Sequence, residues 1–325
     1  EGMVRLTHFG SRPAWSPDGK KIAFVGKGPG EAYEIDVETR EIRPLTKHFQ
    51  HAGFFRVHYL SNGDYMLTGP RSIQTPFLAR YRDTELWVLD KGLKKQPVRL
   101  GQTIHEAVAT SPKSLKIAFT ERNAAYMDYV VSPAYTGALE KPDPKMATSL
   151  HVADVVYTNG VPELRNSQEI LNFPTTRCSS PEAQDFRDND KEVIISCSFR
   201  TANSGPIDWS TYGVRLDTKK MIPYREKKAT GWEEVEGIAP DGSWTLVECG
   251  PEKKENEILI DLCRLNLVPS NPELIPLTHF IEQGSSATNP VISPDGQWIA
   301  FQEVPDRFGG FGAGDGIILM RTPGR

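Results

Sequence analysis

The chain has 325 residues, with 38 Lys and Arg against 42 Asp and Glu, and a formal net charge of −4. This near-neutral balance excludes the cationic surface that nucleic-acid-binding proteins use. No apolar run approaches the roughly 18 to 20 residues that a transmembrane helix requires, so we expect no membrane span. The 27 Gly and 25 Pro, together with few long helical patterns, indicate many short strands joined by tight turns.

One pattern recurs along the chain. It reads RPAWSPDGKKIAF in its first copy and TNPVISPDGQWIAF in its last, and the fifth copy reads EGIAPDGSWTLV. Six copies start at Arg12, Val57, Val108, Gln184, Glu236 and Thr288. Self-similarity at a period of about 40 to 70 residues is the signature of a repeat architecture rather than of two ordinary domains.

Each copy predicts a four-stranded antiparallel sheet. The Asp-Gly or Asn-Gly pair supplies the backbone conformation of a tight hairpin, and an alternating apolar strand follows it. The sequence therefore predicts an all-β fold, a six-bladed β-propeller with seven blades as the alternative count, in which residues 1–325 form a single domain. The last copy stops at its third strand, GIILMRT, so we expect the N-terminal segment Met3 to Thr7 to close the final blade.

These copies resemble the TolB-type β-propeller repeats, whose blade pattern is close to P-x-W-S-P-D-G-K-x-I-A-F. The resemblance covers nearly the whole chain and is strongest in the first, fifth and sixth copies. More distantly, the chain is similar to propeller polysaccharide lyases such as oligogalacturonate lyase. The resemblance implies a secreted or periplasmic protein that acts on a glycan or binds a partner.

Loop lengths predict which end of the propeller carries the site. The connections between the second and third strands (the b–c loops) are long in copies two, three, four and six, so we expect a pocket on that face. Aligning the copies brings to the axis residues that enter the innermost strands, namely Arg12, Arg56, His58, His105, Glu106, Glu182, Gln184, Glu234, Glu236 and Asn289. Arg80 and Tyr126 come from the long loops.

This set of residues favours β-elimination at a uronic acid. Arginines neutralise the carboxylate and acidify the neighbouring C–H, and a His or Tyr removes that proton. We therefore expect His105 as the base, with His58 and Tyr126 as further catalytic candidates. The expected substrate-binding residues are Arg12, Arg56, Arg80, Glu106, Gln184, Glu234, Glu236 and Asn289. The leading hypothesis is a polysaccharide or oligosaccharide lyase whose partner is an acidic glycan.

Several alternatives stay open at this point. The protein could be a non-catalytic TolB-like propeller that binds a protein or glycan through its b–c loop face, with the arginines paired to Glu182, Glu234 or Glu236 as structural ion pairs. A glycosidase pair of carboxylates drawn from Glu234, Glu236, Glu182 and Asp185 is a further alternative and is less favoured than the lyase. No cofactor and no metal site are predicted, although a divalent ion is left open, because the histidines lack metal-ligand spacing.

The four cysteines show no zinc or redox spacing. Antiparallel strands bring Cys178 and Cys197 within reach of a disulfide. Cys249 and Cys263 stand at unequal distances from their turn, so we expect two buried thiols there.

Overall fold

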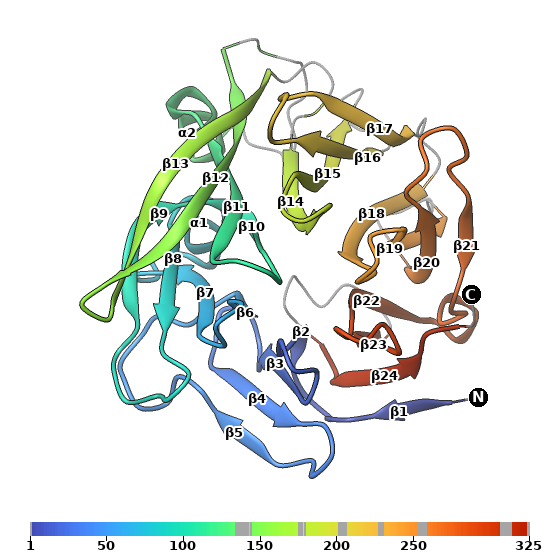
Figure 1. Ribbon diagram of the computed structural model, residues 1–325, viewed down its shortest axis with the longest axis horizontal. Coiled ribbons are helices and arrows are strands. Elements are labelled where there is room, and N and C mark those ends of the chain that lie inside the picture. The colour runs from blue at the N-terminus through green and yellow to red at the C-terminus, as the bar shows by residue number, and fades with distance from the viewer. Residues whose placement is uncertain are drawn as a thin grey trace.

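The computed structural model describes residues 2–133, 143, 145–174, 178, 180–200, 207–226, 231–251, 259–305 and 314–323. Six four-stranded sheets surround a common axis, and the innermost strand of each sheet faces that axis (Figure 1). The predicted six-bladed propeller is confirmed. No helix in the described ranges is long and apolar enough to cross a membrane.

The first three blades follow one another along the chain, each running from its innermost to its outermost strand. Their strands are β2 (Ser11–Trp15), β3 (Lys21–Val25), β4 (Ala32–Asp36), β5 (Ile42–Pro44); β6 (Arg56–Tyr59), β7 (Tyr65–Pro70), β8 (Thr84–Leu89), β9 (Val98–Thr103); and β10 (His105–Thr110), β11 (Lys116–Arg122), β12 (Ala147–Thr158), β13 (Val161–Pro174).

The remaining blades repeat this order until the ring closes. Their strands are β14 (Ser180–Arg187), β15 (Glu192–Arg200), β16 (Ile207–Arg215), β17 (Met221–Glu226); β18 (Gly231–Ile238), β19 (Trp244–Pro251), β20 (Asp261–Asn266), β21 (Leu274–Pro276); and β22 (Ser285–Ile292), β23 (Trp298–Pro305), β24 (Ile317–Arg321). The N-terminal strand β1 (Met3–Arg5) pairs with β24 as the fourth strand of the last blade. The predicted closure is confirmed, and both ends of the chain lie at this blade (Figure 1).

The hairpin turns between the first two strands of a blade (the a–b turns) owe their form to the Asp-Gly pairs. Gly19, Gly242 and Gly296 all have φ near +70°, a conformation that glycine adopts without steric cost. A serine and the turn aspartate hold the turn in place, as where Ser16 Oγ donates to Asp18 Oδ1 at 2.6 Å. The same bond joins Ser293 to Asp295. The repeated sequence motif therefore forms the same kind of turn in these blades.

Two short helices lie within the b–c connections. Helix α1 (Pro76–Tyr81) belongs to the second blade, and α2 (Ala124–Val130) belongs to the third. Thr75 and Asn123 cap them, because each side-chain oxygen accepts a backbone N–H of the first turn. A one-turn 3-10 helix, Ile281–Gln283, precedes β22. The sequence pattern predicts these segments only as long loops.

Buried polar contacts join neighbouring blades. The carboxylate of Glu34 on β4 accepts hydrogen bonds from Tyr59 (2.6 Å) and Tyr65 (2.5 Å) of the next blade, and Lys21 and Arg43 pair with it. Although burial opposes ionisation, these four donors hold the pKa of Glu34 below its ordinary value. The ionised carboxylate of Glu34, with a partner for each oxygen, therefore joins blades one and two.

Both pairs of cysteines form disulfides. The expected bond between Cys178 and Cys197 is confirmed. The expectation of free thiols at Cys249 and Cys263 is wrong, because their Cα atoms lie 5.9 Å apart and the sulfurs are bonded. The register explains this difference. Cys263 pairs with Val247, and Cys249, two residues further, points to the same face of the sheet.

Ring closure should depend on the residue that follows β1. Leu6 packs in the cluster that contains Ile317 and Leu319 and is 9% exposed, whereas Val4 is 41% exposed. We predict that Leu6→Ala lowers the free energy of unfolding by about 2–4 kcal/mol, as for other buried leucines. Val4→Ala is the matched control and should cost under about 0.5 kcal/mol. Equal losses for the two variants in urea denaturation would contradict this account.

A candidate ligand-binding cavity on the propeller axis

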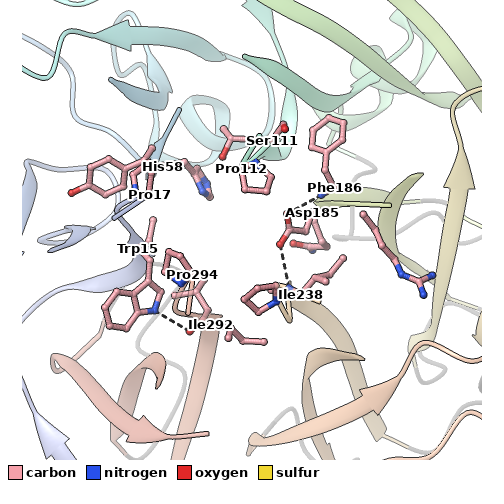
Figure 2. A pocket seen from close by; sticks show the side chains of 18 of the residues that line it. Trp15, Pro17, His58, Ser111, Pro112, Asp185, Phe186, Ile238, Ile292 and Pro294 are labelled. Carbon is pink, nitrogen blue, oxygen red and sulfur yellow. Dashed lines mark hydrogen bonds between the residues drawn. The ribbon is translucent and has the colours of Figure 1, made fainter. Parts of the chain in front are cut away.

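A cavity of about 600 Å³ lies on the axis and opens between the a–b turns. Its mouth carries turn residues of several blades, namely Pro17, Ser61, Pro112, Asn189, Pro240 and Pro294. Figure 2 shows the side chains of the rim, with the imidazole of His58 pointing inward from β6. The loop lengths predicted a pocket on the b–c face, and this cavity opens on the opposite face. The b–c connections lie in part outside the described residues.

Interruptions in strand pairing bring polar residues to the axis. The register between the first two strands shifts in five of the six blades, and the unpaired stretch contains Arg12, Glu106, Gln184, Glu236 or Asn289. Such a bulge bends the strand and redirects a side chain. Four of these five residues line the cavity. The side chain of Glu106 lies outside the described part of the chain.

The backbone is strained at two of these positions. Arg12 has φ 57° and Asn289 has φ 48°, a left-handed region that is uncommon for Arg and tolerated better by Asn. Each amide N–H is held by a side chain of the preceding blade. Arg12 N donates to Gln302 Oε1 at 2.7 Å, and Asn289 N donates to Glu248 Oε1 at 2.6 Å. The neighbouring blade thereby holds each strained residue in position, as is common at functional sites.

One side of the cavity is cationic. Arg12 and Arg56 are each 8% exposed, line the cavity, and flank His58. The Nε atom of Arg56 and the Nε2 atom of His58 are buried without a hydrogen-bond partner in the described structure. Burial, together with the charges of Arg56 and Arg12, lowers the pKa of His58 to about 3. The imidazole is therefore neutral at pH 7 and can accept a proton.

A cluster of three carboxylates lies near these arginines, and one of the three, Glu236, lines the cavity. The side-chain oxygens of Glu234, Glu236 and Glu248 all lie within 4.8 Å of one another. Burial raises the pKa of Glu236 to about 8 and that of Glu248 to about 7, and repulsion from Glu248 adds to the rise at Glu236. The pKa of Glu234 is raised well above its usual value by burial and by Glu182, Glu248 and Glu236. At neutral pH this cluster therefore holds protons that ordinary carboxylates have lost.

An oxygen-only donor set of this kind has the chemistry of a site for a hard divalent cation. Glu234, Glu236 and Glu248 are the residues that would hold one. The histidines considered from the sequence are not part of this group. Arg12 and Arg56 also act on it, since both lower the pKa of Glu236 and Glu248.

Two other predicted residues, His105 and Tyr126, form a separate group with Arg122. His105 is 2% exposed and does not line the cavity. Its Nε2 atom lies 2.8 Å from Ser180 Oγ and accepts from Arg122 Nη2 at 2.9 Å. Arg122 in turn stacks on the ring of Tyr126 at 4.4 Å. The structure thus brings His105 and Tyr126 together through Arg122, a residue that the sequence analysis missed, and separates them from His58.

Arg80 and Glu182 also stand apart from the cavity lining. Arg80 lies on α1 with its guanidinium over the ring of Tyr81, and Glu182 lies on β14. The sequence analysis missed Glu248, which lies on the second strand of its blade, β19, and considered Asp185, which lines the cavity, only as a glycosidase carboxylate. Asp185 on β14 is half-buried, and burial raises its pKa to about 7 although it accepts the N–H groups of Ile238 and Phe186. A polar residue inside an apolar strand was the available signal for Glu248.

Comparison with solved structures shows the propeller fold. The chain is similar to a putative TolB from Agrobacterium tumefaciens (11% identity, TM-score 0.54, covering 89% of this chain and 97% of that one). It is also similar to an oligogalacturonate lyase in complex with manganese (13% identity, TM-score 0.54, covering 96% of this chain and 76% of that one). A gluconolactonase from Xanthomonas campestris is similar as well (12% identity, TM-score 0.56, covering 99% of this chain and 89% of that one). The chain spans 55% of the length of TolB from Acinetobacter baumannii.

No family model matches the chain, and no curated protein sequence matches it. The resemblance to TolB-like propellers and, more distantly, to oligogalacturonate lyase is confirmed at the level of the fold.

The carboxylate cluster should make stability depend on pH. Glu236 keeps its proton in the folded state up to a pH of about 8, whereas its ordinary value is 4.5, so its contribution is lost as the pH rises through 8. His58 acts in the opposite sense, but its contribution is complete above its ordinary value of 6.5. We predict that the free energy of unfolding falls as the pH rises from about 6.5, where the contribution of His58 is complete, to about 8, and that Glu236→Gln reduces this fall. The exposed variant Glu38→Gln is the control. An unchanged fall in Glu236→Gln would refute the assignment.

The strain at Arg12 can be measured with two substitutions that remove the same side chain. Arg12→Gly permits the positive φ and Arg12→Ala does not. We therefore predict that the glycine variant is more stable than the alanine variant by about 1 kcal/mol in urea denaturation. This order is the reverse of that expected in an ordinary strand, where glycine is the less stable residue. If the ordinary order is found, the backbone at Arg12 is not strained.

Proposed function

We propose that this propeller binds a uronate-containing oligosaccharide in the axial cavity and cleaves it by β-elimination. One observation carries the proposal. Two buried arginines, Arg12 and Arg56, and a neutral histidine, His58, line the same end of an accessible cavity. A carboxylate is the natural partner of paired guanidinium groups. The similarity to an oligogalacturonate lyase supports the same class of chemistry.

His58 has the properties of the base in this reaction. When Arg12 and Arg56 bind the uronate carboxylate, they stabilise the negative charge that develops as the neighbouring C–H bond breaks. The bound carboxylate also offsets the two positive charges that depress the pKa of His58, so the imidazole becomes a stronger base once substrate is present. We place the base at His58 rather than at His105, because His105 is buried against Arg122 and Ser180.

A protonated Glu236 can complete the reaction. Its raised pKa of about 8 keeps it a neutral acid at pH 7, able to donate a proton to the leaving glycosidic oxygen. The C–H electron pair then forms the C=C bond, the C–O bond breaks, one proton rests on His58 and another has left Glu236. Two groups in one cavity whose pKa values are displaced in opposite directions are typical of an acid and base pair. Gln184 and Asn289 also line the cavity, and in this proposal they contact hydroxyl groups of the sugar.

The proposal includes a location outside the cytoplasm. The two disulfides, Cys178–Cys197 and Cys249–Cys263, support it, because disulfides persist in secreted and periplasmic proteins and are rare in the cytosol.

The test is a panel of galacturonate, glucuronate and mannuronate oligosaccharides, with the ultraviolet absorbance of the unsaturated product as the measurement. We expect one member of the panel to be cleaved and His58→Ala to lower kcat by a factor of about 10² to 10⁴. His8→Ala, which alters an exposed histidine of the same chain, should leave kcat unchanged.

The outcomes separate catalysis from binding. If an oligosaccharide binds and Arg56→Gln abolishes binding, but no product forms, the protein is a glycan-binding propeller and the lyase chemistry is wrong. If no uronate compound binds at all, the whole proposal fails, and binding of a protein partner becomes the hypothesis to test.

A further inference from the structure

A second cavity lies beside the first on the a–b turn face. It has a volume of about 240 Å³ and is formed between blades five and six. Ala239 and Pro240, at the turn between β18 and β19, line both cavities. The turn of blade six touches this wall, because a Cβ atom on Gly296 would lie 3.6 Å from Pro240. A ligand that leaves the axial cavity over Pro240 therefore enters the second one directly.

The second cavity is cationic. Its charged lining residues are Arg264 and Arg321, and it contains no Asp or Glu. Arg264 stacks on Trp244 at 4.9 Å, and Arg321 stacks on Trp298 at 4.6 Å. Cation–π stacking orients a guanidinium group but leaves its N–H donors available. The Nε atom of Arg264 is buried with no hydrogen-bond partner in the described structure.

Two other stacked arginines in the described part of the chain are paired with a carboxylate. Arg99 lies over Trp87 at 5.5 Å, and Glu85 accepts from it at 2.8 Å. Arg187 lies over Tyr224 and pairs with Glu192. Among the described residues, Arg264 and Arg321 form no such pair. Because an uncompensated pair of guanidinium groups in a cavity favours an anion, the composition of this cavity selects a negatively charged ligand group.

We propose that this second cavity is a subsite for a second carboxylate of the same uronate oligosaccharide. This inference rests on the proposed function of the axial cavity. It specifies the substrate further, as an acidic chain long enough to place one carboxylate on Arg12 and Arg56 and another on Arg264 and Arg321. The wall at Pro240 separates the two groups, so a single uronic acid cannot reach both.

The test is calorimetric binding of uronate oligosaccharides of two to six residues. We expect the affinity of the wild-type protein to rise by about tenfold or more once the chain spans both cavities, since hydrogen bonds to charged groups are worth that much. In the double variant Arg264→Gln/Arg321→Gln the rise should vanish, while the shortest ligand that binds should bind as it does to the wild-type protein. Arg321→Gln alone, at an exposed position, should lose part of the rise.

Arg99→Gln is the matched control, because Arg99 also stacks on a tryptophan but is paired with Glu85. It should leave both short and long ligands unaffected. Unfolding midpoints of all variants verify that each is folded. A rise that is absent from the wild-type protein, or that survives in the double variant, overturns the subsite while leaving the axial site intact.

A separate measurement covers the case in which no uronate oligosaccharide binds and the proposed function fails. Titration with inorganic sulfate, followed by tryptophan fluorescence, then tests the cavity alone. A change that the double variant lacks would show an anion site independent of the axial cavity, and no change in the wild-type protein would overturn the anion site as well.

Discussion

The interrupted pairing of the innermost strands is the feature on which the axial cavity depends. A regular hairpin would alternate its side chains between the two faces of each blade and would leave the channel to backbone and small residues. The bulges instead direct Arg12, Gln184, Glu236 and Asn289 to the axis. At two blade junctions the neighbouring blade stabilises the bulge, since Gln302 and Glu248 accept hydrogen bonds from the backbone N–H groups of Arg12 and Asn289.

Electrostatic imbalance follows from this placement. Arg12 and Arg56 lie near three clustered carboxylates that are desolvated by burial, so the three carboxylates are not all ionised at neutral pH. The protein resolves this by keeping protons on the carboxylates and removing one from His58. In the proposed reaction, Glu236 and His58 would then be in their reactive forms, as acid and base, before the substrate binds. Such preorganisation lowers the cost of reorganising charge during a reaction.

Much of this could be predicted from the sequence, and the parts that could not have physical reasons. The Asp-Gly turns fixed the repeat, and aligning the copies identified Arg12, Arg56, Gln184, Glu236 and Asn289, because equivalent positions in a propeller share a distance from the axis. Loop length did not predict the face on which this cavity opens, because short a–b turns surround its mouth. Glu248 and Arg122 were missed because they lie on the second strands of their blades, β19 and β11, whereas the alignment compared residues that enter the innermost strands. The bond between Cys249 and Cys263 depends on strand register, which a count of residues from a turn does not determine.

The pairing of β1 with β24 has a consequence for when the site comes into existence. Arg12 follows the closing strand by only a few residues, and its amide is held by Gln302 of the last blade. The first residue of the cavity therefore takes its position only after the final blade has been synthesised and the two ends of the chain have met. When β1 and β24 are not paired, the wall of the cavity at Arg12 is therefore incomplete.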